Sequence, residues 1–118
     1  MSKYAKVLVD IPVEELDQSF DYRVPEKCRD VIRIGQAVMV PFGPRKVTGF
    51  VIGLADETEV EEKKIREINR IIFTDTFFDE NLLELFQWMA GYYKAKLINI
   101  IKTAVPAGVV SGQLKKKT

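Results

Sequence analysis

The chain has 118 residues, of which 47% are hydrophobic, 10% aromatic and 30% charged. This length leaves room for a single domain with one core, and the composition is that of a soluble globular fold. Eighteen basic residues against seventeen acidic ones give a formal net charge of +1, which argues against a strongly cationic nucleic-acid binder. Any contact with nucleic acid is therefore expected to be local.

Residue types that support metal binding, disulfides or membrane insertion are scarce. Cys28 is the single cysteine, and the chain contains no histidine, the commonest metal ligand and general base. No stretch approaches the roughly 18 apolar residues of a membrane span, and the N-terminus lacks the apolar run of a signal peptide. We therefore expect no metal, no cofactor, no membrane partner and a cytoplasmic location.

Alternating apolar residues predict two strands near the N-terminus. Residues 4–11 alternate with period two and are followed by a proline, and residues 19–24 alternate again. In the second strand, Phe20 and Tyr22 share one side, which we expect to face the core. Asp21 then points the other way, toward solvent, a loop or a ligand.

The middle of the chain predicts a β-hairpin. Residues 25–34 are typical of a connection, with a turn at 33–36, and the apolar run 37–40 predicts a strand. The sequence Pro-Phe-Gly-Pro at 41–44 is expected to end this strand, and residues 47–54 predict the strand that returns.

The remaining elements complete an α+β fold. The charged stretch 55–64 predicts a solvated loop, and residues 65–73 favour a strand that closes the sheet. Asp79 can cap a helix that begins at Glu80, and residues 97–104 predict a second short helix. The expected fold is a small, curved, mostly antiparallel sheet or partial barrel, followed by one or two C-terminal helices. Residues 1–106 would form the domain and residues 107–118 the start of a linker.

Two motifs have both a structural and a functional interpretation. The aromatic rings beside Asp21 can simply pack in a core, and Gly43 can simply permit a turn. In the functional interpretation, Gly43 lets a ligand approach bare backbone that a Cβ would block. Cations near exposed aromatic rings commonly bind phosphates and stacked bases. The nearby cations are Arg45, Lys46, Lys63, Lys64 and Arg66. For Lys63 and Lys64, which follow a run of glutamates, a solvated surface is the stronger interpretation.

The sequence carries no recognisable catalytic site. There is no GxxxxGK[ST] phosphate loop and no histidine base, and adjacent glutamates lie in polar segments that do not desolvate them. We expect this chain not to be an enzyme.

The order and spacing of several segments resemble one family. These segments are SFDYRVP (19–25), VMVPFG (38–43), TGFVIGL (48–54), LLELFQWMAGYY (82–93) and AVPAG (104–108). In this order they resemble the N-terminal DNA-binding domain of PriA, the bacterial primosomal helicase that restarts stalled replication forks. The likeness covers all but about the last ten residues.

The resemblance implies a DNA-binding role and a set of site residues. It implies a domain that binds the free 3′ end of a nascent strand in forked or primed DNA, and that meets other primosome proteins only through the parent protein. The family's pocket is formed around an FD pair, a turn glycine and a lysine, which fall here on Phe20, Asp21, Gly43 and Arg66. A register shift would bring in Lys64 instead, and Tyr22, Arg45 and Lys46 complete the candidate DNA-binding residues. The family's ATPase and zinc-binding cysteines belong to parts of the parent protein outside this chain.

Two other functions fit the same sequence. A protein-interaction module would present Trp88, Tyr92 and Tyr93 to a partner. A generic single-strand binder would depend on Arg45 and Lys46 rather than on Asp21, and would bind a circular strand as well as a linear one.

Overall fold

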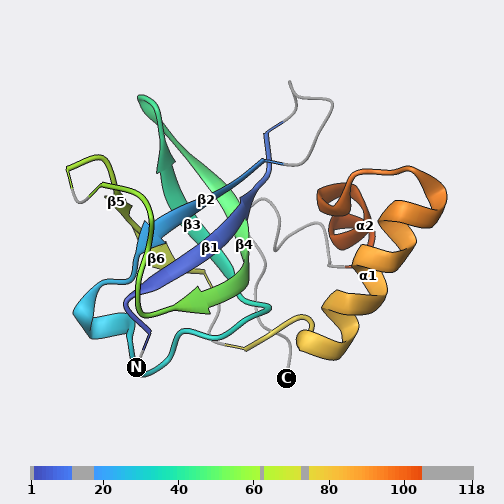
Figure 1. The fold of residues 1–118 in the computed structure, drawn as a ribbon, viewed down its shortest axis with the longest axis horizontal. Helices are drawn as coiled ribbons and strands as arrows, with labels where there is room; N and C mark the ends of the chain where they lie inside the picture. Colours follow the sequence, from blue (N-terminus) through green and yellow to red (C-terminus); the bar gives the residue numbers. More distant parts are fainter. Residues whose placement is uncertain (1, 12–17, 62, 73–74, 105–118) are drawn as a thin grey trace.

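The structure, a computed structural model, describes residues 2–11, 18–61, 63–72 and 75–104. Six strands and a short 3-10 helix come first, and two α-helices follow (Figure 1). The elements are β1 (Tyr4–Val9), β2 (Gln18–Arg23), η1 (Glu26–Cys28), β3 (Ala37–Phe42), β4 (Arg45–Ala55), β5 (Arg66–Glu67), β6 (Arg70–Ile71), α1 (Glu80–Tyr93) and α2 (Leu97–Ala104).

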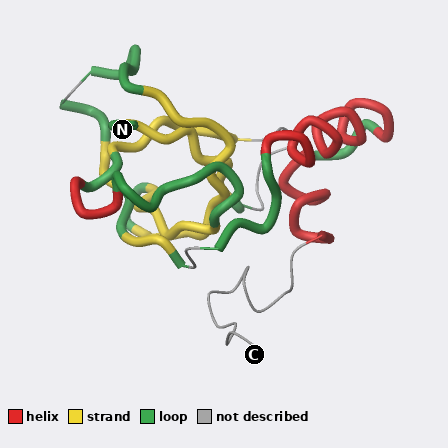
Figure 2. The backbone as a smooth tube through the Cα atoms, turned by 90° about the horizontal axis from the view of Figure 1, so that it is seen from below, coloured by secondary structure: helices red, strands yellow, loops and turns green. Residues whose placement is uncertain are grey.

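The strands form one curled, mixed sheet in the order β5-β2-β1-β4-β3-β6. All neighbours are antiparallel except β2 and β5, which are parallel. Figure 2 shows the strands bending around a common interior, with both helices to one side. The predicted α+β class and the curved, mostly antiparallel sheet are confirmed.

The segment that closes the sheet is two short strands rather than the single strand predicted for residues 65–73. β5 pairs with β2 at one edge and β6 pairs with β3 at the other. Between them, the Ile68 amide donates to the Arg23 carbonyl and the Asn69 amide to the Met39 carbonyl. The chain changes partner after two residues because it bridges both edges, and this produces a half-barrel. The predicted last position, residue 73, lies outside the described residues.

Two apolar clusters lie on the two faces of the sheet. One fills the interior of the half-barrel and includes Val7, Val9 and Val51. The other joins the outer face to the helices and includes Leu8 and Phe50. The sequence predicted only one strongly buried face for β1, but Leu8 is buried too, because the helices cover its side of the sheet.

Several predicted boundaries shift. β1 ends at Val9 rather than at residue 11, although Ile11 is still buried. β3 continues past residue 40 to Phe42. Pro41 is tolerated because β6 pairs with β3 only at residues 38 and 39, so the missing N–H of Pro41 lies at a free stretch of edge.

The first helix begins at Glu80 as predicted, and the second matches its predicted range of residues 97–104. The Asp79 carboxylate accepts a hydrogen bond from the Leu82 amide at 2.8 Å, which is the predicted N-cap. Within the described part of the chain, no helix combines the length and the apolarity that crossing a membrane requires. The predicted domain end at residue 106 and the linker at 107–118 lie outside the described residues.

Candidate functional site

A pocket of about 200 Å³ opens where β2, the turn between β3 and β4, and β5 come together. Its lining residues are Phe20, Asp21, Tyr22, Pro41, Phe42, Gly43, Val60, Lys64 and Arg66. Six of the eight candidate residues from the sequence are therefore in one place. Arg45 and Lys46 are exposed on the adjoining end of β4 and do not line this pocket.

Two hydrogen bonds fix the β3–β4 turn against the neighbouring strands. The Tyr22 hydroxyl donates to the Pro41 carbonyl at 2.9 Å, and Arg66 Nη1 donates to the Gly43 carbonyl at 2.9 Å. Tyr22 and Arg66 are themselves paired in the β2–β5 ladder. Because both strands hold the turn, the rim of the pocket is preorganised.

Phe20 does not lie in the core as predicted. Its side chain is 39% exposed, whereas Tyr22, two residues along the same strand, is 4% exposed. The Phe20 ring packs against that of Phe42, with centroids 5.7 Å apart and planes at 51°. The face of β2 that Phe20 and Tyr22 share extends beyond the barrel interior at Phe20, so an aromatic surface is left at the pocket.

Asp21 is held by a loop residue, Thr58, that was not among the predicted site residues. The Thr58 hydroxyl donates to Asp21 Oδ2 at 2.6 Å and accepts a hydrogen bond from the Val60 amide at 3.2 Å. The prediction that Asp21 points toward solvent, a loop or a ligand is thus met by the loop between β4 and β5. The one local signal was that Thr58 and Val60 are the only uncharged residues in the stretch 56–64.

A larger hollow of about 760 Å³ adjoins the pocket and shares Phe20, Asp21 and Val60 with it. The two hollows differ in charge. Two cations, Lys64 and Arg66, line the pocket, whereas Glu57, Glu59 and the cation Lys6 join Asp21 in the larger hollow. Of these two hollows, the smaller one is the better site for an anion.

Gly43 has a structural reason to be glycine and also leaves its backbone open. Its φ of +60°, followed by Pro44, is the pattern of a type II′ hairpin turn, which favours glycine at its first central position. A Cβ built on Gly43 would meet no atom within 4 Å apart from those of its two chain neighbours. The backbone at the pocket rim is therefore accessible to a ligand.

The two candidate cations of the β5 region are engaged differently. Arg66 is bonded to the turn, whereas Lys64 Nζ lies 3.9 Å from Glu61 Oε2 in a pair that is largely exposed. Such exposed pairs contribute little free energy. Lys64 can therefore move toward a ligand at small cost, while Arg66 already holds its position.

Burial raises the pKa of the Tyr22 phenol, and the positive charge of Arg66 offsets part of this rise. Because the folded state holds the phenol proton more tightly than the unfolded state, the resulting stability is complete below the ordinary pKa of 10.0 and is lost as the pH rises through the folded-state pKa.

For Tyr22→Phe we expect a loss of about 1 kcal/mol in the free energy of unfolding at pH 8, because the hydrogen bond to Pro41 disappears. The difference from the unsubstituted protein should shrink as the pH rises above about 10. Urea unfolding at pH 8 and at pH 10.5 measures both values. Tyr92→Phe, at a 66% exposed position, should change neither. A Tyr22→Phe difference that stays constant with pH would contradict this assignment.

Together, the curled sheet, the two helices on its outer face and the mixed-charge pocket at its rim define a small α+β domain with a candidate binding pocket. Within the described ranges, no three His, Cys, Asp or Glu side chains gather as a candidate metal site. A family model described as a 3′ DNA-binding domain matches residues 6–106. The chain belongs to this family, the 3′ DNA-binding domains of PriA.

Curated relatives agree with this assignment. The replication restart protein PriA of Bacillus subtilis is 29% identical over 106 residues, which are 90% of this chain and 13% of the relative. The PriA proteins of Rickettsia conorii and Synechocystis are 33% and 32% identical, over 98% and 91% of this chain and 17% and 12% of the relatives. This chain thus spans less than a fifth of the length of these bacterial relatives.

Proposed function

We propose that this domain binds the free 3′-hydroxyl end of a DNA strand, in the pocket between β2, the β3–β4 turn and β5. The observation that supports this most is one small pocket that combines an acceptor-only carboxylate, exposed glycine backbone, an aromatic ring and cations. Its volume is below the roughly 300–1,000 Å³ of drug-sized ligand sites, which suits the terminal sugar or base alone.

Asp21 supplies the selectivity for a hydroxyl. An ionised carboxylate accepts hydrogen bonds and donates none, so it favours a 3′-hydroxyl and repels a 3′-phosphate. The hydroxyl of Thr58 occupies one of about four lone-pair positions, and acceptor capacity is left for a ligand. A hydrogen bond to a charged group contributes about 1.5–3 kcal/mol, which corresponds to roughly tenfold or more in affinity.

The other lining residues bind without reading the base. The exposed ring of Phe20 offers a face on which any base can stack. Arg66 and Lys64 sit where they can meet the phosphate on the 5′ side of the terminal sugar, and Arg45 and Lys46 can serve the next one. This small number of phosphate contacts agrees with the net charge of +1 of the domain. Because few counterions are released on binding, the affinity should depend only weakly on salt concentration.

In this proposal the chain hydrolyses no ATP and acts as the end-recognition part of a larger cytoplasmic restart protein. Its partners are forked or primed DNA and, through the parent protein, other primosome components. Family membership supports this assignment, as do relatives several times longer than the chain that are replication restart proteins.

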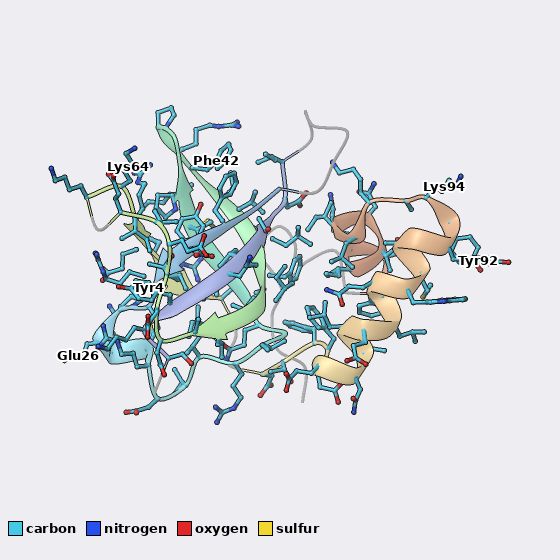
Figure 3. All side chains as sticks on the ribbon, viewed as in Figure 1. Tyr4, Glu26, Phe42, Lys64, Tyr92 and Lys94 are labelled. Atoms are coloured by element: carbon cyan, nitrogen blue, oxygen red, sulfur yellow. The ribbon has the colours of Figure 1, made fainter. Side chains whose placement is uncertain are left out.

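The exposed aromatic side chains of α1 do not compete with this site. Trp88, Tyr92 and Tyr93 are 60%, 66% and 64% exposed. Figure 3 shows Tyr92 on the side of the molecule opposite Phe42 and Lys64. Any protein contact made by α1 would leave the pocket open.

Asp21→Asn tests the proposal, because the amide keeps the shape of the side chain but adds a donor and removes the charge. We expect the unsubstituted domain to bind a short oligonucleotide with a 3′-hydroxyl at least about tenfold more tightly than one with a 3′-phosphate, and Asp21→Asn to lose most of this preference. Fluorescence anisotropy titrations at one fixed salt concentration measure the four affinities.

Asp30→Asn is the matched control. This exposed residue lines neither hollow, and its substitution removes the same charge as Asp21→Asn does. It should leave the preference intact. Equal affinities of the unsubstituted domain for the two oligonucleotides would reject the end pocket. Equal affinity for a circular strand and a linear one would instead support a generic single-strand binder.

A further inference from the structure

One side chain of the loop between β4 and β5 is bonded to the carboxylate of Asp21. Thr58 lies 37 positions from Asp21 in sequence, yet its hydroxyl donates to Asp21 Oδ2 at 2.6 Å. The same oxygen accepts the Val60 amide at 3.2 Å. A single hydroxyl therefore ties the pocket carboxylate to the backbone of the loop.

This arrangement fixes two parts of the pocket at once. Asp21 lies on the strand face opposite Tyr22, so the interior core does not hold its side chain. The bond from Thr58 selects one orientation of the carboxylate and leaves its other lone pairs free for a ligand. Val60, placed by the same hydroxyl, lines both the pocket and the larger hollow.

We propose that Thr58 is a positioning residue for 3′-end selectivity: its hydroxyl orients the Asp21 carboxylate and seats Val60 as the wall between the two hollows. This inference depends on the proposed function of the pocket. Glu57 and Glu59, the neighbours of Thr58, then stand in the larger hollow beside Asp21. A strand that continued past the terminal sugar into that hollow would carry its phosphate toward these carboxylates.

Loss of the hydroxyl should therefore weaken selectivity more than overall binding. Within the described residues, the cations Lys64 and Arg66 make no hydrogen bond to Thr58: Arg66 donates to the Gly43 carbonyl, and Lys64 pairs with Glu61. The contacts of these cations with the phosphate on the 5′ side should persist. An Asp21 carboxylate that is free to rotate, however, should distinguish a 3′-hydroxyl from a 3′-phosphate less well.

The test compares Thr58→Val, which keeps the shape without the hydroxyl, with Thr58→Ser, which restores the hydroxyl. For the full chain we expect Thr58→Val to reduce the ratio of 3′-hydroxyl to 3′-phosphate affinities about fivefold, and Thr58→Ser to recover most of it. Thr103→Val, at an exposed position on α2, is the control for the same chemical change and should leave the ratio unaltered.

A double-mutant cycle with Asp21→Asn separates this role from general stability. If Thr58 acts through Asp21, Thr58→Val should change the ratio by less than twofold once Asp21 is Asn. If Asp21→Asn lowers the ratio but Thr58→Val leaves it unchanged, this inference fails and the end pocket stands. If neither substitution changes the ratio, the proposed function fails as well. A Thr58→Ser variant that behaves like Thr58→Val would also overturn the role of the hydroxyl.

Discussion

Gly35→Ala should lower the free energy of unfolding by at least about 3 kcal/mol, which corresponds to a fall of roughly 12–24 °C in melting temperature for a domain of this size. Gly35 has a φ of +99°, and a Cβ at this position would lie 1.8 Å from the Phe78 carbonyl oxygen and 2.9 Å from its carbonyl carbon. Both contacts are with backbone, so no side-chain rotation relieves them.

The effect should be large because Gly35 joins the sheet to the segment that leads into α1. Its amide donates to the Val51 carbonyl, and its carbonyl accepts from the Phe77 amide, both at 2.9 Å. Phe78, next in the chain, is buried between the rings of Phe50 and Phe86. A methyl group at position 35 would therefore displace an apolar contact as well as two hydrogen bonds.

Thermal unfolding followed by far-UV circular dichroism measures this loss. Gly91→Ala is the matched control, because Gly91 lies in α1 and an added Cβ would meet nothing within 4 Å beyond its chain neighbours and the local backbone of the helix. It should raise the melting temperature slightly through helix propensity. A Gly35→Ala variant that melts within about 3 °C of the unsubstituted domain would show that the loop yields more easily than its contacts indicate.

The elements with strong local signals were predicted closely. The first helix begins at Glu80 as predicted and the second spans the predicted residues 97–104, because the Asp79 cap and the three-to-four apolar spacing act within one turn. The hairpin of β3 and β4 was predicted too, although both strands continue closer to the two-residue turn at Gly43 and Pro44 than the predicted residues 40 and 47.

What the sequence did not predict depends on residues that are distant along the chain. Residues 66–71 pair first with β2 and then with β3, the two edges that the curl of the whole sheet brings to this segment, which is not a property of six residues. Phe20 alternates like a core residue, but whether its position falls inside the barrel or at its rim depends on where β2 meets the turn. The alternation of apolar residues identifies which face of a strand is directed toward the core, but not the position along the strand at which the core ends.

The same distinction applies to the pocket. Resemblance and residue chemistry brought Phe20, Asp21, Gly43 and Arg66 together in the prediction, and the structure places all four around one hollow. Their DNA-binding roles stay predictions. The bond from Arg66 to the Gly43 carbonyl and the bond from Thr58 to Asp21 were not predicted, because each joins residues more than 20 positions apart.

Gly43→Ala should weaken binding of a 3′-hydroxyl oligonucleotide at least about tenfold while the domain stays folded. The positive φ makes alanine unfavourable by about 1–2 kcal/mol, a cost that a folded domain can tolerate. Apart from its two chain neighbours, nothing lies within 4 Å of the added methyl group, so the main effect of the substitution falls on a ligand that approaches the rim of the pocket. Anisotropy titration, with circular dichroism to confirm folding, separates the two effects.

Gly53→Ala provides the comparison that locates the ligand. Gly53 lines the larger hollow, and an added Cβ would make an ordinary contact of 3.5 Å with Lys6 Cβ. If the terminal sugar sits in the smaller pocket, Gly53→Ala should change the affinity less than about threefold, because the methyl group lies outside the contact surface. A reversed result, with Gly53→Ala weakening binding and Gly43→Ala affecting only stability, would place the DNA end in the larger hollow. In that case the role of Gly43 would be limited to the turn. A ligand in contact with its backbone would have clashed with the methyl group of Gly43→Ala, and binding would have weakened.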